Sequence, residues 1–169
     1  MAHRYIEHPL PPIFDASSTV LILGSFPSVK TRQAGFPYGH PQNRFWPVMS
    51  ALLGCEPELT ATEPERARRV LLARGVALWD SIAACEIVGS SDSSIRDVVP
   101  HDLSPIFAAA RIRHVFCNGN ASFRYFQQYQ QAYRHIPAAG LPSTSPANAQ
   151  RSLPALIEAW RVILPYLDQ

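Results

Sequence analysis

The residue types best suited to chemistry gather in one stretch, GFPYGHPQNRFW, which runs from Gly35 to Trp46. It combines a histidine, an amide and an arginine with several aromatic rings, a mixture too irregular for a strand and too rich in rings for an ordinary surface loop. Its two prolines fix φ and remove donors, which stiffens the loop. Rings can stack on a planar ligand, and the polar groups can hydrogen-bond to it. We interpret this stretch as part of a functional site.

A helix is expected to follow directly, over residues 43–53, because Phe45, Trp46 and Met49 begin a three-and-four spacing of apolar residues that ends at Gly54. Further helices are predicted over Arg66–Arg74, from Asp102 through Ala110, after Asn118, and from Ser152 to about Leu164. The stiff loop would therefore deliver Asn43 to the start of a helix.

Strands are expected between these helices, at Thr19–Gly24, 76–80 and 114–118, with a fourth between Tyr133 and Leu141. Strands that alternate with helices favour a mostly parallel sheet covered on both faces. We therefore predict an α/β fold: a single three-layer αβα domain, residues 1–169, with a central sheet of roughly four strands. Residues 1–18 are predicted to be an irregular N-terminal arm. Ligands of such sheets bind at the carboxyl ends of the strands.

The composition is that of a compact globular protein, with 47% apolar and 17% charged residues. A net charge of +2 does not by itself indicate a polyanionic partner, and Lys30 is the only lysine. The cysteines, Cys55, Cys85 and Cys117, form no metal-binding pattern and are expected to be reduced and buried. No metal or cofactor is expected. Without a leader-like start or a long apolar run, we predict a soluble cytoplasmic protein that needs no membrane.

Three motifs in order carry a family resemblance: GSFPS after the first strand, then FPYGHPQNRFW, then LPSTSPANA before the last helix. Together they resemble the uracil-DNA glycosylase superfamily over nearly the whole chain. The central motif is similar to that of mismatch-specific uracil and thymine glycosylases, whereas GSFPS, the strand ending in LWD and LPSTSPANA are closer to hypoxanthine (deoxyinosine) DNA glycosylases. The resemblance implies a monomer that acts on DNA containing deaminated bases.

A glycosylase flips its target base into a pocket, stacks it on a ring and reads its edge. The resemblance implies that Tyr38 is the stacking ring, although Tyr38 could instead be a core residue. It also implies that Asn43 orients the attacking water, because Phe26 stands where mismatch-specific enzymes carry that asparagine. An amide orients water through its carbonyl without acting as a strong base. The alternative for Asn43 is an N-cap of the following helix.

Further base contacts are expected from Gly24, Ser25, Phe26 and His40 around the pocket mouth, where His40 could also be purely structural. Asp80 ends the second strand at the same sheet edge, where a carboxylate could accept a hydrogen bond from the N1–H of hypoxanthine or steady a cationic sugar. Its alternatives are a helix cap and an ion pair with an arginine. Asp92 is a weaker candidate of the same kind.

The loop over residues 141–148 matches the place where the superfamily wedges into the base stack. DNA contacts are therefore predicted at Ser28, Ser143, Thr144, Ser145, Pro146 and Asn148. Many members carry a histidine in this motif that stabilises the departing base, and this chain has Leu141 or Thr144 in its place, which weakens the case for uracil.

The predicted function is that of a monofunctional DNA glycosylase that releases hypoxanthine. The alternatives are a uracil- or xanthine-preferring enzyme of the same fold and a nucleic-acid-binding module without catalysis.

Overall fold

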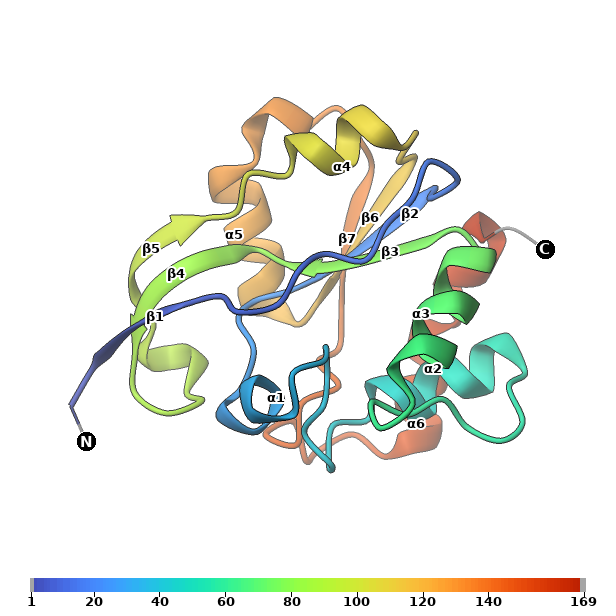
Figure 1. Cartoon of the computed structure of the whole chain (residues 1–169), viewed down its shortest axis with the longest axis horizontal. Helices are drawn as coiled ribbons and strands as arrows, with labels where there is room; N and C mark the ends of the chain where they lie inside the picture. Colours follow the sequence, from blue (N-terminus) through green and yellow to red (C-terminus); the bar gives the residue numbers. More distant parts are fainter. Residues whose placement is uncertain (1, 168–169) are drawn as a thin grey trace.

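The computed structural model of the protein describes residues 2–167, and its centre is a parallel sheet. The strands β2 (Val20–Gly24), β3 (Val76–Asp80), β6 (His114–Asn118) and β7 (Ala138–Leu141) lie in the order β3-β2-β6-β7 (Figure 1). Each neighbouring pair is parallel. Every residue of β2 and β6 is buried, as expected for strands covered on both faces. All the predicted strands of this sheet are confirmed.

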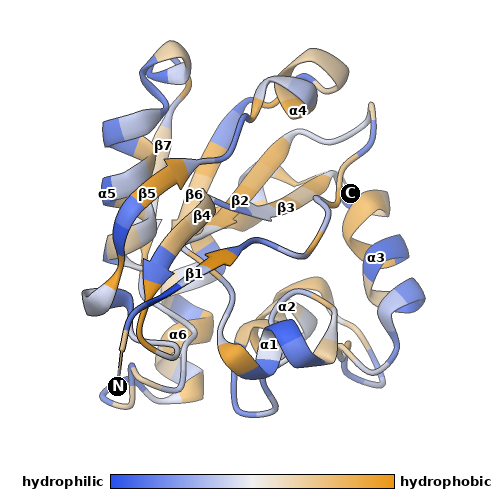
Figure 2. Cartoon of the chain, turned by 60° about the vertical axis from the view of Figure 1, so that its left-hand side comes forward, coloured by the Kyte–Doolittle hydropathy of each residue, from blue (hydrophilic) through white to orange (hydrophobic). Residues whose placement is uncertain are grey.

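Alternate residues of β2 face two separate helical layers. Val20 and Ile22 pack with α2 (Phe45–Leu53), α3 (Pro64–Ala73) and α6 (Leu153–Trp160) on one side. Leu21 and Leu23 pack with α4 (Ser104–Ala109) and α5 (Asn120–Tyr129) on the other. The apolar strands therefore run between two layers of helices (Figure 2). The predicted three-layer αβα arrangement is confirmed.

The predicted helices are present, with shifted ends. The C-terminal helix is the main difference, because α6 ends at Trp160 and the chain continues as a 3-10 helix, Arg161–Tyr166, that contains Pro165. Proline lacks the N–H that an α-helix would need at that position. Short 3-10 helices also occur at Asp92–Ser94 and Gln131–Tyr133.

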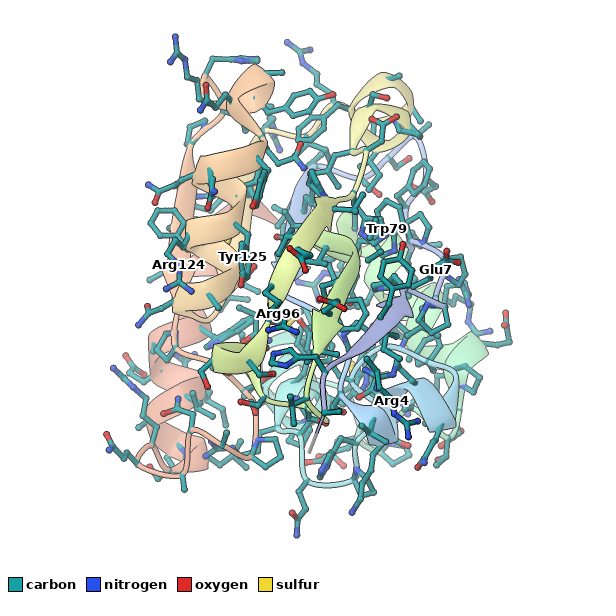
Figure 3. All side chains as sticks on the ribbon, turned by 90° about the vertical axis from the view of Figure 1, so that its left-hand side faces the viewer. Arg4, Glu7, Trp79, Arg96, Arg124 and Tyr125 are labelled. Carbon is teal, nitrogen blue, oxygen red and sulfur yellow. The ribbon has the colours of Figure 1, made fainter. Side chains whose placement is uncertain are left out.

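A second, antiparallel sheet of β1 (Arg4–Glu7), β4 (Ile82–Ile87) and β5 (Arg96–Pro100) was not predicted. The prediction of an irregular arm is therefore wrong for Arg4–Glu7, which pairs with β4 through partners such as Arg4 and Ile87. β1 is mostly exposed and β5 carries little apolar periodicity, so only long-range pairing reveals them. This sheet lies in the foreground of Figure 3, with Arg96 on β5 and Arg4 on β1.

The cysteines are free thiols, as predicted, but Cys55 is only half-buried. Burial raises the pKa of Cys85 to about 11 and that of Cys117 to about 12, so both are neutral at physiological pH. In the part of the chain that the structure describes, no helix has the length and apolar character needed to span a membrane.

Candidate active site

A cavity of about 500 Å³ opens at the carboxyl edge of the central sheet. Gly24, Asp80 and Asn118 line it from the ends of β2, β3 and β6. The strand order reverses around β2, and open α/β sheets bind ligands at such a switch point. The cavity brings together all but one of the site residues predicted from the sequence: Gly24, Ser25, Phe26, Ser28, Tyr38, His40, Asn43, Asp80, Asp92, Ser143, Thr144, Ser145 and Pro146.

Tyr38 is half-buried in this wall, with its ring 4.1 Å from that of Phe45 and nearly parallel to it. Phe45 is fully buried on α2, so it supports one face of the Tyr38 ring. The Tyr38 backbone has a φ of 55°, an unusual conformation for a bulky residue that marks a constrained turn. Burial raises the pKa of Tyr38 above its usual range, and the negative charge of Asp80 adds a smaller effect in the same direction. The phenol therefore stays neutral.

Asn43 is not the N-cap of α2, the alternative considered from the sequence, because Arg44 occupies that position. Asn43 belongs instead to a chain of hydrogen bonds that joins three segments. Its Oδ1 accepts from the N–H of Phe45 at 2.9 Å and from the hydroxyl of Thr144 at 2.8 Å. The Thr144 Oγ1 in turn accepts from the Asn118 amide at 2.9 Å, and the Thr144 N–H donates to Asn118 Oδ1 at 3.0 Å. A carbonyl oxygen has two lone pairs, and both are used. The expectation that the Asn43 carbonyl orients a water is therefore wrong for this arrangement, because both lone pairs have donors. The Nδ2 amide group is the one left for a ligand, since residues 2–167 supply it no hydrogen-bond acceptor.

The predicted DNA-binding loop is held in place by Arg44. The Arg44 N–H donates to the Thr144 carbonyl at 3.0 Å, and its guanidinium donates to the carbonyls of Asn148, at 2.7 Å, and Arg151. Five donors in a fixed fork make arginine well suited to bind several carbonyls of one loop. Arg44 thus couples the loop to the start of α2.

The polar side chains of that loop differ in which of their groups are free to contact DNA. Thr144 is fully buried with its hydroxyl committed, so a DNA contact through that hydroxyl would require the loop to open. Ser143 and Ser145 accept from the N–H groups of Ser145 and Ala147, which leaves both hydroxyl protons available. Asn148 lies outside the main cavity and lines a second hollow of about 560 Å³ with Arg151.

Ser28 and His40 also line the cavity. Ser28 is the N-cap of α1 (Val29–Ala34), where its Oγ accepts from the Thr31 N–H at 3.1 Å. His40 Nδ1 accepts from the Gln42 N–H at 3.0 Å, so the ring proton of the neutral form resides on Nε2. His40 therefore combines a structural contact with a free donor.

Asp80 is tied to two histidines. Its Oδ2 accepts from His8 Nε2 at 2.7 Å, and its backbone carbonyl accepts from His101 Nδ1, also at 2.7 Å. The His101 ring stacks on Trp79 with centroids 3.6 Å apart, and burial lowers its pKa to about 4, so it is neutral at pH 7. The second carboxylate oxygen, Oδ1, lies beside Gly24, only 2.3 Å from where a β-carbon on that glycine would stand. Both alternatives considered for Asp80, a helix cap and an arginine pair, are thus replaced by a histidine contact.

Asp92 approaches the cavity from the loop between β4 and β5. The Ser25 hydroxyl lies 3.1 and 3.2 Å from its two oxygens. Asp92 is an exposed residue, but its carboxyl lines the cavity, and the partial burial there raises its pKa. Phe26, predicted to contact the base, is 8% exposed and packs edge-on against His8, so it contributes a wall rather than a polar contact.

This three-layer αβα fold has an aromatic and amide-lined cavity at its switch point, and these are features that an enzyme acting on a planar, extruded base needs. The family profile of the uracil DNA glycosylase superfamily matches residues 11–164, and the chain belongs to that superfamily. It is a DNA glycosylase whose substrate is DNA.

Two curated relatives, both named hypoxanthine DNA glycosylase, come from Methanosarcina species. The one from Methanosarcina acetivorans is 30% identical over 87% of this chain and 91% of its own length. The one from Methanosarcina barkeri is 29% identical over 68% of this chain and 72% of its own. A solution NMR structure from Methanosarcina acetivorans, provisionally named a uracil DNA glycosylase, has a TM-score of 0.74 and 25% identity, and the match covers 95% of this chain and 99% of that one.

Sequence reasoning missed three residues of the site: His8, Arg44 and Asn118. Asn118 could have been found, because it ends the strand HVFCN at the same sheet edge as Asp80. Arg44 was visible in the central motif without a role. No pattern in the sequence indicated His8 as a site residue, because its position depends on the pairing of β1 with β4.

Proposed function

We propose that this glycosylase releases hypoxanthine from deoxyinosine in DNA by hydrolysis, as a single domain acting as a monomer. The observation that carries the proposal is the Asp80 carboxylate in the cavity, with Oδ2 occupied by His8 and Oδ1 beside Gly24. A carboxylate oxygen accepts the N1–H that hypoxanthine presents, whereas adenine presents an acceptor at N1 and is repelled. The names of both curated relatives agree with this substrate.

Uracil also offers a ring N–H, so Asp80 alone does not separate the two bases. The cavity of about 500 Å³ has room for a purine, and the last motif has Thr144 or Leu141 in place of a histidine that would stabilise departing uracil. These two features favour hypoxanthine over uracil. The binding-module alternative is set aside, because the chain belongs to a family of glycosylases.

In the proposed reaction the N9–C1′ bond breaks with its electron pair leaving on the base, and water adds to the cationic C1′. Asn43 donates from Nδ2 to the oxygen of that water, which keeps a second lone pair for C1′. The water then loses a proton to solvent, and the departing base anion takes up a proton from solvent to give neutral hypoxanthine. The free face of Tyr38 stacks the base, and Ser28, Ser143, Ser145 and Pro146 contact the distorted strand, while Thr144 positions Asn43.

The proposed enzyme is monofunctional. A lyase step needs an amine that attacks C1′, and Lys30, the only lysine, is exposed on α1 and is absent from the cavity wall.

The test is excision from end-labelled duplexes that carry a single deoxyinosine, deoxyuridine or xanthosine. We expect inosine to be cut fastest, with strand scission only after alkali treatment. Faster release of uracil or xanthine would refute the substrate assignment, and scission without alkali would refute the hydrolytic, monofunctional mechanism.

A further inference from the structure

His8 lies in the N-terminal segment, directly after β1, which is an edge strand of the second sheet. Its N–H donates to the Ala83 carbonyl at 2.8 Å, directly after the pairing of β1 with β4. In Figure 3 the end of β1, marked by Glu7, lies near Trp79, whose ring is 6.1 Å from that of His8. The His8 side chain is 1% exposed and lies edge-on to Phe26 and His101. The imidazole is therefore held rigidly in the cavity wall.

The proton on His8 is placed by its backbone surroundings. The Leu10 N–H donates to Nδ1 at 3.2 Å, and because a backbone N–H can only donate, Nδ1 carries no proton. The proton is then on Nε2, which donates to Asp80 Oδ2 at 2.7 Å. His8 thus binds the carboxylate as a neutral donor in one defined tautomer.

A neutral donor and a cationic one, such as arginine or lysine, differ in their effect on the charge of the Asp80 carboxylate. The neutral donor fixes the rotation of the carboxylate without cancelling its charge, so Oδ1 keeps its strength as an acceptor. The other titratable groups near Asp80 are Tyr38, which is neutral, Asp92, which repels it, and His101, which binds its backbone carbonyl. Only His8 among the described residues hydrogen-bonds to the carboxylate itself.

We propose that His8 is a positioning residue for base recognition: its Nε2–H holds Asp80 Oδ2 so that Oδ1 is aimed at the ring N–H of the flipped base. This inference rests on the proposed function and extends it to the N-terminal segment. Loss of the donor lets the carboxylate rotate and removes the aimed acceptor, while the segment stays attached through β1 and through the mutual hydrogen bonds of Ile13 and Leu78, at 2.9 and 2.8 Å.

The experiment compares His8→Phe, which keeps a ring but removes the donor, with His8→Gln, whose amide nitrogen replaces Nε2. His135→Phe is the matched control, because His135 is exposed and lies outside the cavity wall. Under single-turnover conditions with an inosine duplex, His8→Phe should be roughly 10- to 100-fold slower. His8→Gln should recover most of that loss, and the control should match wild type.

A double-mutant cycle shows whether His8 acts through Asp80. If it does, His8→Phe slows the wild type but adds nothing in an Asp80→Asn background. Equal loss in both backgrounds, equal rates for His8→Phe and His8→Gln, or a His8→Phe variant as fast as wild type would each overturn the inference. If His8→Phe fails to fold, as judged by circular dichroism, the cycle is run with His8→Ala.

A measurement on the unmodified protein keeps the test independent of folding. The ¹⁵N spectrum of the histidine rings should show His8 protonated on Nε2, and free hypoxanthine should shift His8 but not His135. A His8 signal protonated on Nδ1, or one that hypoxanthine leaves unmoved, refutes the role. Failure of wild type to release hypoxanthine would instead refute the proposed function, which distinguishes the two ideas.

Discussion

Substitution of Asn43 separates its structural role from its chemical one. Asn43 Oδ1 accepts from the Phe45 N–H and the Thr144 hydroxyl, whereas Nδ2 has no acceptor within the described residues. Asn43→Ala removes all of these groups. Asn43→Asp keeps an oxygen for both donors and deletes only the amine, because a carboxylate has acceptors alone.

The expected losses of unfolding free energy follow from the two hydrogen bonds that Asn43 Oδ1 accepts. Loss of the acceptor for the Phe45 N–H costs about 1 kcal/mol, and an unpaired Thr144 hydroxyl costs about 1–2 kcal/mol. Asn43→Ala should therefore lose about 2–3 kcal/mol of unfolding free energy, which lowers Tm by roughly 4–12 °C in a chain of this size. Asn43→Asp should be as stable as wild type or slightly more so, because a carboxylate is favourable at the start of α2. Both variants should release hypoxanthine about 100- to 1,000-fold more slowly.

The assay is single-turnover excision from an inosine duplex, beside urea unfolding of each variant. Gln42→Ala is the control, since Gln42 is the exposed neighbour and its contact with His40 uses only its backbone N–H. Full activity in Asn43→Asp would refute the role of Nδ2 as a donor. If the excision rate falls only where the unfolding free energy falls, in both variants, Asn43 has a structural role alone.

Three further predictions follow from the carboxylates and the buried histidine. Gly24→Ala puts a β-carbon 2.3 Å from Asp80 Oδ1 and 2.9 Å from the Tyr38 hydroxyl. We therefore expect excision to be at least about 100-fold slower, while circular dichroism shows an intact fold. A wild-type rate would contradict the placement of Asp80. Asp92→Asn should raise the unfolding free energy at pH 7 only slightly, because burial of the carboxyl raises the pKa of Asp92 but solvent screens this exposed residue. In urea titrations the gain should vanish as pH falls below the ordinary pKa of 3.8, where the carboxyl is protonated in both states. The pKa of His101 in the folded protein is lowered from 6.5 to about 4. The full unfolding free energy should therefore be kept above pH 6.5 and should fall by about 1–2 kcal/mol, with allowance for screening by solvent, as pH decreases towards 4. His101→Asn, which keeps a donor for the Asp80 carbonyl, should flatten that pH dependence, and an unchanged slope would assign the acid sensitivity to another group.

The sequence by itself determined the central sheet and the family. β2 is an uninterrupted apolar run, which is typical of a strand buried on both faces, and β6 has an apolar centre between His114 and Asn118. The alternation of strands with helices then leaves few topologies. The same reasoning placed Asp80 at the ligand-binding edge, because the carboxyl ends of parallel strands share one edge. Long, specific motifs carried the class of enzyme.

Only the tertiary structure decided how the polar groups are connected. The direction of the Asn43 amide depends on Thr144, about a hundred positions away in the chain, and the partner of Asp80 is a histidine from the N-terminal segment. Hydrogen bonds between distant segments follow from packing, which leaves no local periodicity to read. For the same reason the second sheet escaped prediction, since β1 is short, exposed and defined only by its pairing with β4.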